Sequence, residues 1–473
     1  MRRAVAVPLV LLLAAAGCTR ASDPVPVRTP VPQPTFSAGT DGIGDDYFPA
    51  YGNGGYDVAG YDLNLRYDPA SGKLGGTATI TATATQDLSA FNLDLAGLTV
   101  SSVTVDRATA RFSAARNELT VTPAVGIVRT TQFTTVVEYA GTPQAIGNDT
   151  LGEGGWQRTR DGGFALGQPE SASTWFPVND HPADKATFEL AMTVPDGVAA
   201  ISNGVPGGRT SSGGWSTWTW TESKPLASYL SFVAIGHYRV ESATHLGKPM
   251  VIAIPESLPA DGPAAKSLAR TGEVADFLAT QFGPYPFDAY GGVVLDDQRV
   301  SYALETQSRP VYGSVFFRAE NAGVVAHELA HQWFGDSVAL ERWQDIWLNE
   351  GFATYAEWLW SEHEGTATAQ QIFDRKYESF DWTRTPGRPG TAGLFGEAVY
   401  DRGGMTVHAL RKAIGDAAFF GLLKSWPAEH ADGNATTEDF VRSAEKAAGG
   451  KDLSAFFDDW LYGRTKPPLS VNQ

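Results

Sequence analysis

The stretch that decides the fold is residues 325–336, Val-Ala-His-Glu-Leu-Ala-His-Gln-Trp-Phe-Gly-Asp. On a helix, His327 and His331 are four residues apart, so both imidazoles leave the same face one turn apart and can hold one metal ion. Glu328 lies roughly 100° around the helix from His327, where a carboxylate can accept a proton from a water molecule beside the metal. The stretch therefore predicts a helix that carries a catalytic metal site.

A second stretch, residues 347–352 (Trp-Leu-Asn-Glu-Gly-Phe), offers a third ligand in Glu350, which can reach the metal from a neighbouring helix. Three protein ligands and one open position are typical of catalytic zinc, whereas structural zinc is usually enclosed by four ligands, mostly cysteines. The single cysteine of the chain, Cys18, is far away in sequence. We therefore predict one zinc ion per chain, held by His327, His331 and Glu350. The alternative is a pair of ordinary histidines on a buried helix.

The first 17 residues predict an export signal, because two arginines precede an apolar run over residues 4–16 that is too short for a membrane span. Residues 15–18, Ala-Ala-Gly-Cys, are similar to a bacterial lipobox, in which the cysteine is lipidated and becomes the first residue of the mature protein. A lone cysteine fits that role, since exported proteins tend to use cysteines in pairs. We therefore expect Cys18 to anchor a lipoprotein at the extracellular face of a bacterial membrane. A plain secretory signal and a secreted protein are the alternative.

Length and charge limit the organisation and the partners of the chain. Its 473 residues exceed what one hydrophobic core usually serves, so we expect more than one domain. The formal net charge of −17 argues against nucleic acid as a partner and against a polybasic membrane surface. We expect membrane association only through the lipid anchor, and a monomer.

The chain up to about residue 240 predicts a tether and then a β-domain. Residues 18–40 are rich in proline and threonine, which is typical of an extended linker. Residues 41–240 alternate apolar and polar positions with period two, in runs bounded by Gly, Asp, Asn and Pro. Because no long helical pattern interrupts about 190 residues, we predict an N-terminal antiparallel β-domain.

Residues 241–473 predict a mostly helical domain with a small sheet, so the whole chain is expected to be an α+β multidomain protein. A helical stripe covers residues 264–282, and short strands are expected at 291–296 and 300–304, the second followed directly by Glu305. Beyond the two metal helices, the pattern predicts helices around 369–377, 405–414, 416–425, 437–447 and 453–461.

These residues resemble one family, the aminopeptidase N type of gluzincin zinc metallopeptidase. Its signature joins a His-Glu-x-x-His helix to a glutamate 19 positions after the second histidine, and Glu350 stands 19 positions after His331. The resemblance runs from about Tyr56 to Tyr462 and includes Trp-Phe-Pro at 175–177. It implies a saddle-like antiparallel β-domain followed by a thermolysin-like, mostly helical catalytic domain.

The resemblance also implies roles for three residues outside the metal motifs. Tyr400, in Ala-Val-Tyr-Asp-Arg-Gly-Gly, fits the catalytic tyrosine of the family, which usually stands in a Tyr-x-Lys-Gly context and donates a hydrogen bond to an oxyanion. Glu305, in Tyr-Ala-Leu-Glu-Thr, corresponds to the glutamate of the family's Gly-x-Met-Glu-Asn motif, which pairs with the free α-ammonium of a substrate. As a second contact to that amine we prefer Gln168 over Glu170.

The implied activity is zinc-dependent removal of N-terminal residues from peptides with a free amino terminus. Glu328 is expected to act as the general base, and Tyr400 to stabilise the oxyanion together with zinc. One alternative is a zinc endopeptidase with an open cleft, because the motif around Glu305 is altered and larger family members continue beyond the closing helix near residues 453–463. The other is an inactive surface lipoprotein that only binds.

Overall fold

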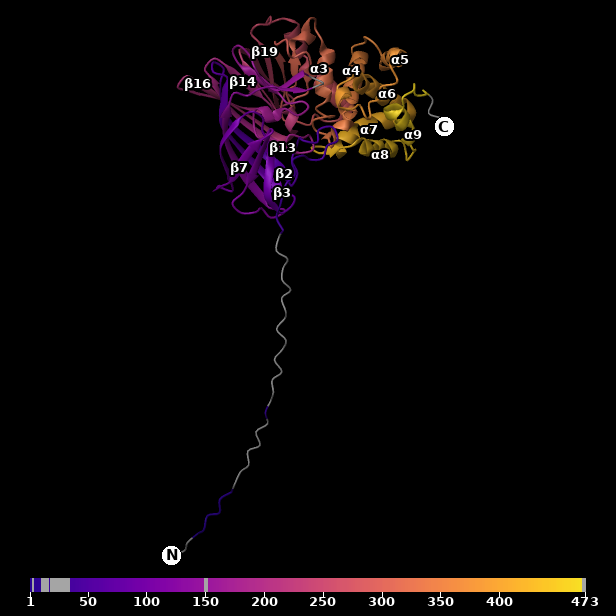
Figure 1. Ribbon diagram of the computed structural model, residues 1–473. Coiled ribbons are helices and arrows are strands. Elements are labelled where there is room, and N and C mark those ends of the chain that lie inside the picture. The colour runs from indigo at the N-terminus through magenta and orange to yellow at the C-terminus, as the bar shows by residue number, and fades with distance from the viewer. Residues whose placement is uncertain (2–3, 10–16, 18–34, 149–151, 470–473) are drawn as a thin grey trace. The chain divides into compact units, whose positions relative to one another are not determined.

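The computed structural model of the protein describes residues 1, 4–9, 17, 35–148 and 152–469 (Figure 1). The chain divides into two units, Met1–Thr35 and Phe36–Gln473, and all helices and strands described below lie in the second. Cys18 and most of the predicted tether lie outside the described residues, so the lipid anchor remains a prediction. Among the described residues, no helix is long and apolar enough to cross a membrane.

The largest sheet belongs to the N-terminal half of the folded unit. Its strands are β2 (Tyr56–Asp68), β3 (Lys73–Ala84), β5 (Thr99–Val105), β6 (Ala108–Thr109), β9 (Gln132–Gly141), β13 (Lys185–Pro195), β15 (Val205–Ser212) and β16 (Trp215–Ala227). They are arranged in the order β15–β16–β13–β2–β3–β9–β5–β6. In β2, Leu63, Leu65 and Tyr67 are buried while Asn64 and Arg66 are exposed, which is the alternation of a strand with one face on the core.

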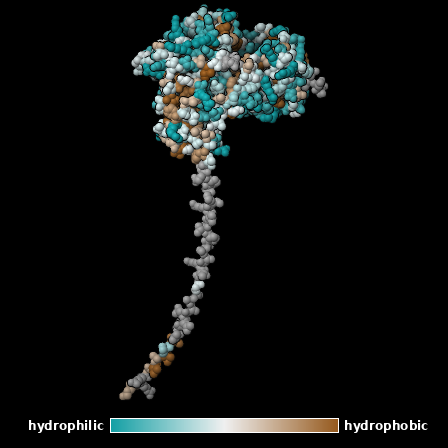
Figure 2. All heavy atoms as spheres, in the orientation of Figure 1, coloured by the Kyte–Doolittle hydropathy of each residue, from teal (hydrophilic) through white to brown (hydrophobic). Residues whose placement is uncertain are grey.

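Two smaller sheets share a core with the large one. Their strands are β1 (Ser37–Ala38), β4 (Leu88–Asp94), β7 (Arg111–Ala115), β8 (Glu118–Thr122), β10 (Ile146–Asn148), β11 (Gly152–Arg158), β12 (Gly163–Leu166), β14 (Ala199–Ser202) and β17 (Phe232–Gly236). The orders are β1–β4–β8–β7 and β10–β11–β12–β17–β14. Phe91, Trp156 and Phe188 are buried in the core that the three sheets form. In the view of Figure 2, apolar residues also reach the surface over the lower part of this half.

The described strand pairs of this half are antiparallel, as predicted, with two exceptions. β13 lies parallel to β2, so that Leu190 stands opposite Leu63, and β1 lies parallel to β4. A parallel pair needs a long crossover connection, whereas hairpin spacing indicates pairs between consecutive strands only. The sequence pattern therefore could not show these two pairs.

The second half contains a mixed sheet with helices packed against it (Figure 1). Its strands are β18 (Tyr238–His245), β19 (Lys248–Pro255), β20 (Tyr290–Leu295), β21 (Ala303–Leu304) and β22 (Val311–Gly313), in the order β18–β19–β20–β22–β21, and β23 (Ala339–Leu340) pairs with β24 (Asn434–Ala435). The helices are α1 (Pro263–Leu268), α2 (Thr271–Phe282), α3 (Ala322–Ala330), α4 (Trp347–His363), α5 (Ala369–Ser379), α6 (Gly403–Ile414), α7 (Asp416–Glu429), α8 (Thr437–Ala447) and α9 (Ser454–Phe457). Short 3-10 turns span Ala172–Thr174, Ser228–Leu230, Ser314–Phe317, Trp343–Asp345 and Thr391–Gly393, and π-helical turns span Ala398–Arg402 and Asp458–Tyr462.

The first helix and the first hairpin of the second half differ from the sequence prediction. The helix expected over residues 264–282 is divided into α1 and α2, and the hydroxyl of Thr271 at the division donates to the carbonyl of Leu268 at 2.7 Å. The hairpin of β18 and β19 was not predicted, because much of β18 is exposed and shows no apolar alternation. Leu246 and Gly247 form its turn, both with positive φ.

Helix α4, which carries Glu350, packs against the segment after α3 through an aromatic contact and against α6 through a close backbone contact. The rings of Phe334 and Phe352 stack with centroids 4.4 Å apart. Gly351 of α4 lies against Gly403 at the start of α6, where a methyl group on Gly403 would come 2.9 Å from the Cα of Gly351. Glycine at both positions therefore lets α4, which carries Glu350, touch the segment that follows Tyr400.

Candidate active site

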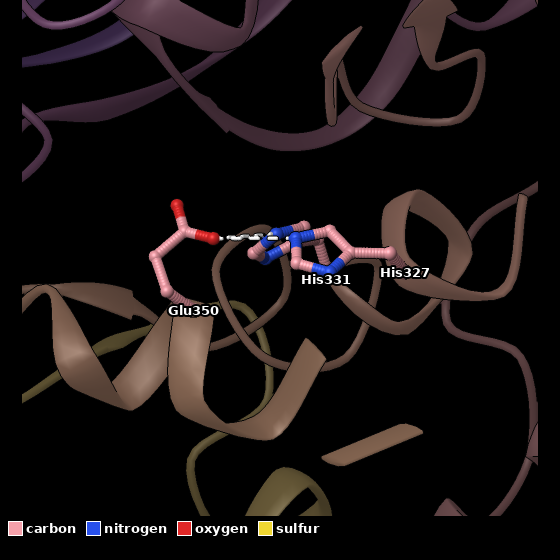
Figure 3. Close-up of side chains that lie close together, drawn as sticks. All are labelled: His327, His331 and Glu350. Atoms are coloured by element: carbon pink, nitrogen blue, oxygen red, sulfur yellow. Dashed lines mark hydrogen bonds and ion pairs between the residues drawn. The ribbon is translucent and has the colours of Figure 1, made fainter. Parts of the chain in front are cut away.

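The predicted metal ligands come from two neighbouring helices. Helix α3 begins after Asn321, whose side chain caps it by accepting a hydrogen bond from the Val324 amide at 3.2 Å. His327 lies in its last turn, and His331 follows directly as the C-cap residue. Glu350 of α4 points its carboxylate at both imidazoles, and its Oε2 atom lies 3.3 Å from His327 Nε2 and 3.4 Å from His331 Nε2 (Figure 3).

These distances fit a tetrahedral metal site. Two donors held about 2.1 Å from one ion at tetrahedral angles lie roughly 3.4 Å apart. The three ligand atoms are buried and lie within 4.8 Å of one another. Two imidazoles with one carboxylate also form a donor set that suits zinc and leaves a position open. The residues present therefore fit the predicted ion.

The outer nitrogens of both histidines are occupied, which directs the inner nitrogens to the shared point. His327 Nδ1 lies 2.6 Å from the Oε1 atom of Glu357, and His331 Nδ1 lies 3.1 Å from the carbonyl oxygen of Phe334. A carboxylate or carbonyl at Nδ1 fixes the tautomer that presents Nε2 to a metal and raises the basicity of the ligand. Glu357 and the Phe334 carbonyl therefore orient the two ligands.

The charges of the triad favour a bound cation. Burial alone would raise the pKa of Glu350, but the neighbouring histidines lower it to about 2. Burial would lower the pKa of His331, but Glu350 and Glu305 raise it to about 9. The pocket thus stabilises positive charge beside an ionised carboxylate, and a metal ion that binds these nitrogens must displace protons.

Glu328 is buried next to the triad and is suited to proton transfer. Burial raises its pKa to about 8, although both metal-binding histidines act in the opposite direction. A carboxyl group with a pKa near the working pH can accept a proton in one step and release it in the next. The structure therefore places Glu328 where the sequence predicted a general base.

Tyr400 lies in the π-helical turn Ala398–Arg402, directly before α6. Its ring lies nearly parallel to that of His327, with centroids 6.0 Å apart and planes at 23°. Burial, followed by the carboxylates Glu350 and Glu305, raises the pKa of Tyr400 well above its usual value. The phenol therefore keeps its proton and can serve as a hydrogen-bond donor beside the metal site.

The predicted amine-binding residues lie in contact, although they come from different domains. Gln168 Nε2 donates to Glu305 Oε1 at 3.2 Å, and the hydroxyl of Tyr229 donates to the same oxygen at 3.2 Å. Gln332, which follows His331, donates to the backbone carbonyl of Glu305 at 3.1 Å. Burial raises the pKa of Glu305, so a cation that pairs with it would favour its ionised form.

A cavity of about 390 Å³ joins these groups. Its walls include the metal triad, Glu328, Tyr400, the Gln168–Glu305 pair, Tyr302, Phe316 and Val324. Glu170, which was the alternative to Gln168, is not among the residues that line it. One space therefore contains a metal site, a proton acceptor, a phenol donor and a buried carboxylate that can bind an amine.

Three residues of the site were not identified from the sequence. Glu357 stands seven positions after Glu350, two helical turns along the same face of α4, and this spacing was a usable signal. Tyr229 lies in a short turn of the β-domain, and its contact with Glu305 depends on how the domains pack. Gln332 belongs to the quoted motif, but no spacing rule indicates that it reaches Glu305.

Comparisons with known proteins match both halves of the chain. The family model for the peptidase M1 N-terminal domain matches residues 58–230, and the model for the peptidase family M1 domain matches residues 277–460. Aminopeptidase M1-D of Oryza sativa subsp. japonica is 29% identical over 457 residues, covering 87% of this chain and 50% of the relative. Aminopeptidase N of Lactococcus lactis subsp. lactis is 28% identical over 326 residues, covering 63% of this chain and 38% of the relative. The chain thus spans about a third to a half of the length of these relatives.

A solved structure matches this chain over most of the length of both chains. A mutant of the M1 zinc metallopeptidase of Deinococcus radiodurans, bound to a Tyr-Ser-Ala substrate, is 31% identical with a TM-score of 0.83, covering 90% of this chain and 99% of that one. The match confirms the predicted fold, a β-domain followed by a helical catalytic domain, and supports zinc as the metal of the His327–His331–Glu350 site. With both halves matched and the resemblance to aminopeptidase N-type gluzincins confirmed, the chain belongs to peptidase family M1.

Proposed function

We propose that the protein is a zinc-dependent aminopeptidase that removes N-terminal residues from peptides. The observation that carries this proposal is the placement of the Gln168–Glu305 pair in the same cavity as the metal triad. A buried carboxylate beside a metal site can hold the free α-ammonium of a peptide through a charge-assisted hydrogen bond. The bond that then reaches the metal site is the first peptide bond. Cleavage of that bond releases the N-terminal residue, which is the reaction of an aminopeptidase.

In the proposed reaction, Glu328, Tyr400 and Glu305 each have a separate role. When bound, zinc polarises the scissile carbonyl and makes water more acidic. Glu328 accepts the proton of the attacking water and delivers it to the departing amine. Tyr400 donates a hydrogen bond to the oxygen that becomes negative during attack. Glu305, steadied by Gln168 and Tyr229, holds the amino terminus so that the reacting groups stay aligned.

The nearest alternative is a zinc endopeptidase, which would use the same metal, base and phenol but not the amine pocket. To separate the two, the purified zinc-loaded protein is incubated with a mixed peptide library, and the cleavage sites are identified by mass spectrometry with and without a chelator. Single residues lost from free amino termini support the aminopeptidase. Cuts distributed through peptide interiors would favour the endopeptidase, and no cleavage at all would favour a binding protein.

We also propose that the protein is exported, anchored by a lipid on Cys18 and monomeric. The lipobox-like sequence at residues 15–18 supports the anchor. A monomer is supported because the metal ligands, Glu328, Tyr400 and Glu305 all come from one chain. In a bacterial host, a Cys18→Ser variant should move from the membrane fraction to the soluble fraction. Light scattering on the soluble variant should give the mass of one chain.

A further inference from the structure

Arg402 ends the π-helical turn that carries Tyr400, and its side chain is completely buried. All five N–H groups of its guanidinium donate to backbone carbonyls. The acceptors are the carbonyls of Trp460 (2.8 Å, from Nε), Trp382 and Arg384 (3.1 and 2.6 Å, from Nη1), and Asp459 and Gly463 (2.9 and 2.6 Å, from Nη2). A guanidinium has five N–H donors in one plane, so every donor of Arg402 is used in this network.

The acceptors belong to two segments that are far apart in sequence. Trp382 and Arg384 lie in the loop after α5, and the others lie in or directly after the π-helical turn Asp458–Tyr462. Carbonyls at the end of a helix lack partners inside the helix, and Arg402 supplies donors to those of Asp459, Trp460 and Gly463. The ring of Trp382 covers the guanidinium at 5.3 Å. Burial lowers the pKa of Arg402 to about 10, which leaves it charged at neutral pH.

The other side of the same segment is held by α4. Gly403, the residue after Arg402, lies against Gly351, the residue after the metal ligand Glu350. No side chain separates the two backbones. The turn with Tyr400 is therefore fixed between the helix that carries a metal ligand and the network of Arg402.

We propose that Arg402 is a positioning residue for Tyr400, because its five hydrogen bonds hold the π-helical turn in the place from which the phenol can reach the substrate carbonyl. The proposal rests on the proposed peptidase function. Displacing a catalytic group by about 1 Å can cost on the order of 100-fold in rate. Loss of donors from Arg402 should therefore lower kcat more than it changes KM.

A double-mutant cycle tests this role. Arg402→Gln keeps at most two of the five donors and should lower kcat by about tenfold or more, with KM and zinc content close to those of the wild type. In a Tyr400→Phe background, the same change should lower kcat by less than about twofold, because the group it positions is already gone. Should Arg402→Gln fail to fold, Arg402→Lys, with three donors, decides the question by the same cycle with a smaller effect.

Arg309 provides the matched control. It is also completely buried, and its guanidinium donates to the backbone carbonyls of Ser202, Gly204 and Val251, away from the turn of Tyr400. Arg309→Gln should lower Tm, and any effect on kcat should be the same with and without Tyr400→Phe. The proposal is overturned if the Arg402 variant lowers kcat equally in both backgrounds, if it leaves kcat unchanged, or if Arg309→Gln shows the same coupling to Tyr400. An inactive wild-type protein would instead contradict the proposed function itself.

Discussion

Replacement of Glu305 by glutamine tests how the site selects amino termini. Glu305 is 2% exposed, and Tyr229 and Gln168 both bond to its Oε1 atom. A glutamine has the same shape, and its amide oxygen can accept both of those hydrogen bonds. The change therefore removes mainly the negative charge that would face the substrate ammonium.

The size of the effect follows from that one interaction. A hydrogen bond to a charged group contributes about 1.5–3 kcal/mol. Since about 1.4 kcal/mol is a factor of ten, we expect kcat/KM for a peptide with a free amino terminus to fall about 10- to 150-fold. Cleavage of the same peptide after N-acetylation should be slow in the wild type and no slower in the variant, because the acetylated terminus offers no ammonium.

The assay compares kcat/KM for the free and acetylated peptides in both proteins. Glu222→Gln is the control, since Glu222 is another buried glutamate, 2% exposed, that does not line the cavity. It should leave the ratio of the two kcat/KM values unchanged. If Glu305→Gln also leaves the ratio unchanged, or if the wild type cleaves the acetylated peptide internally at the rate of the free one, the role of Glu305 is refuted.

Further predictions concern the base, the metal and stability. Glu328→Gln should lower kcat by about 10²- to 10⁴-fold while zinc content stays constant, and turnover near that of the wild type would exclude it as the base. Glu357→Ala removes the partner of His327 and should weaken zinc binding about 10- to 100-fold in a chelator competition; an unchanged Kd would show that Glu357 does not orient the ligand. Burial lowers the pKa of His408 to about 4, against about 6.5 in an unfolded chain, so the unfolded state binds more protons between these values. The free energy of unfolding of the metal-free protein should therefore fall as the pH is lowered from 6.5 towards 4, and urea titrations of His408→Gln should show a shallower decline.

The metal site was predictable because its geometry is local. His327 and His331 share one helix face by their spacing alone, and Glu350 is linked to them by a second short motif. The alternation in β2 likewise indicated a half-buried strand, and the structure has it. Local periodicity is enough to predict which side chains lie together when a single helix or strand determines their positions.

Contacts between distant segments were not predictable in the same way. Gln168 and Glu305 are 137 residues apart, and only the family resemblance, not a spacing rule, suggested that both reach one amine. The parallel pair of β13 and β2 and the anchoring of Arg402 by carbonyls from two remote segments also depend on the tertiary fold. A hydrogen bond to a backbone carbonyl leaves no signal in the identity of the residue that offers it.

The most direct test of the central claim follows one peptide of known sequence with the zinc-loaded protein by mass spectrometry over time. We predict a ladder of products that lose one residue after another from the amino terminus. The ladder should stop on chelation, resume when zinc is restored, and be absent with Glu328→Gln. Products cut first in the peptide interior, or a ladder that persists unchanged in the metal-free protein, would contradict the proposed zinc aminopeptidase.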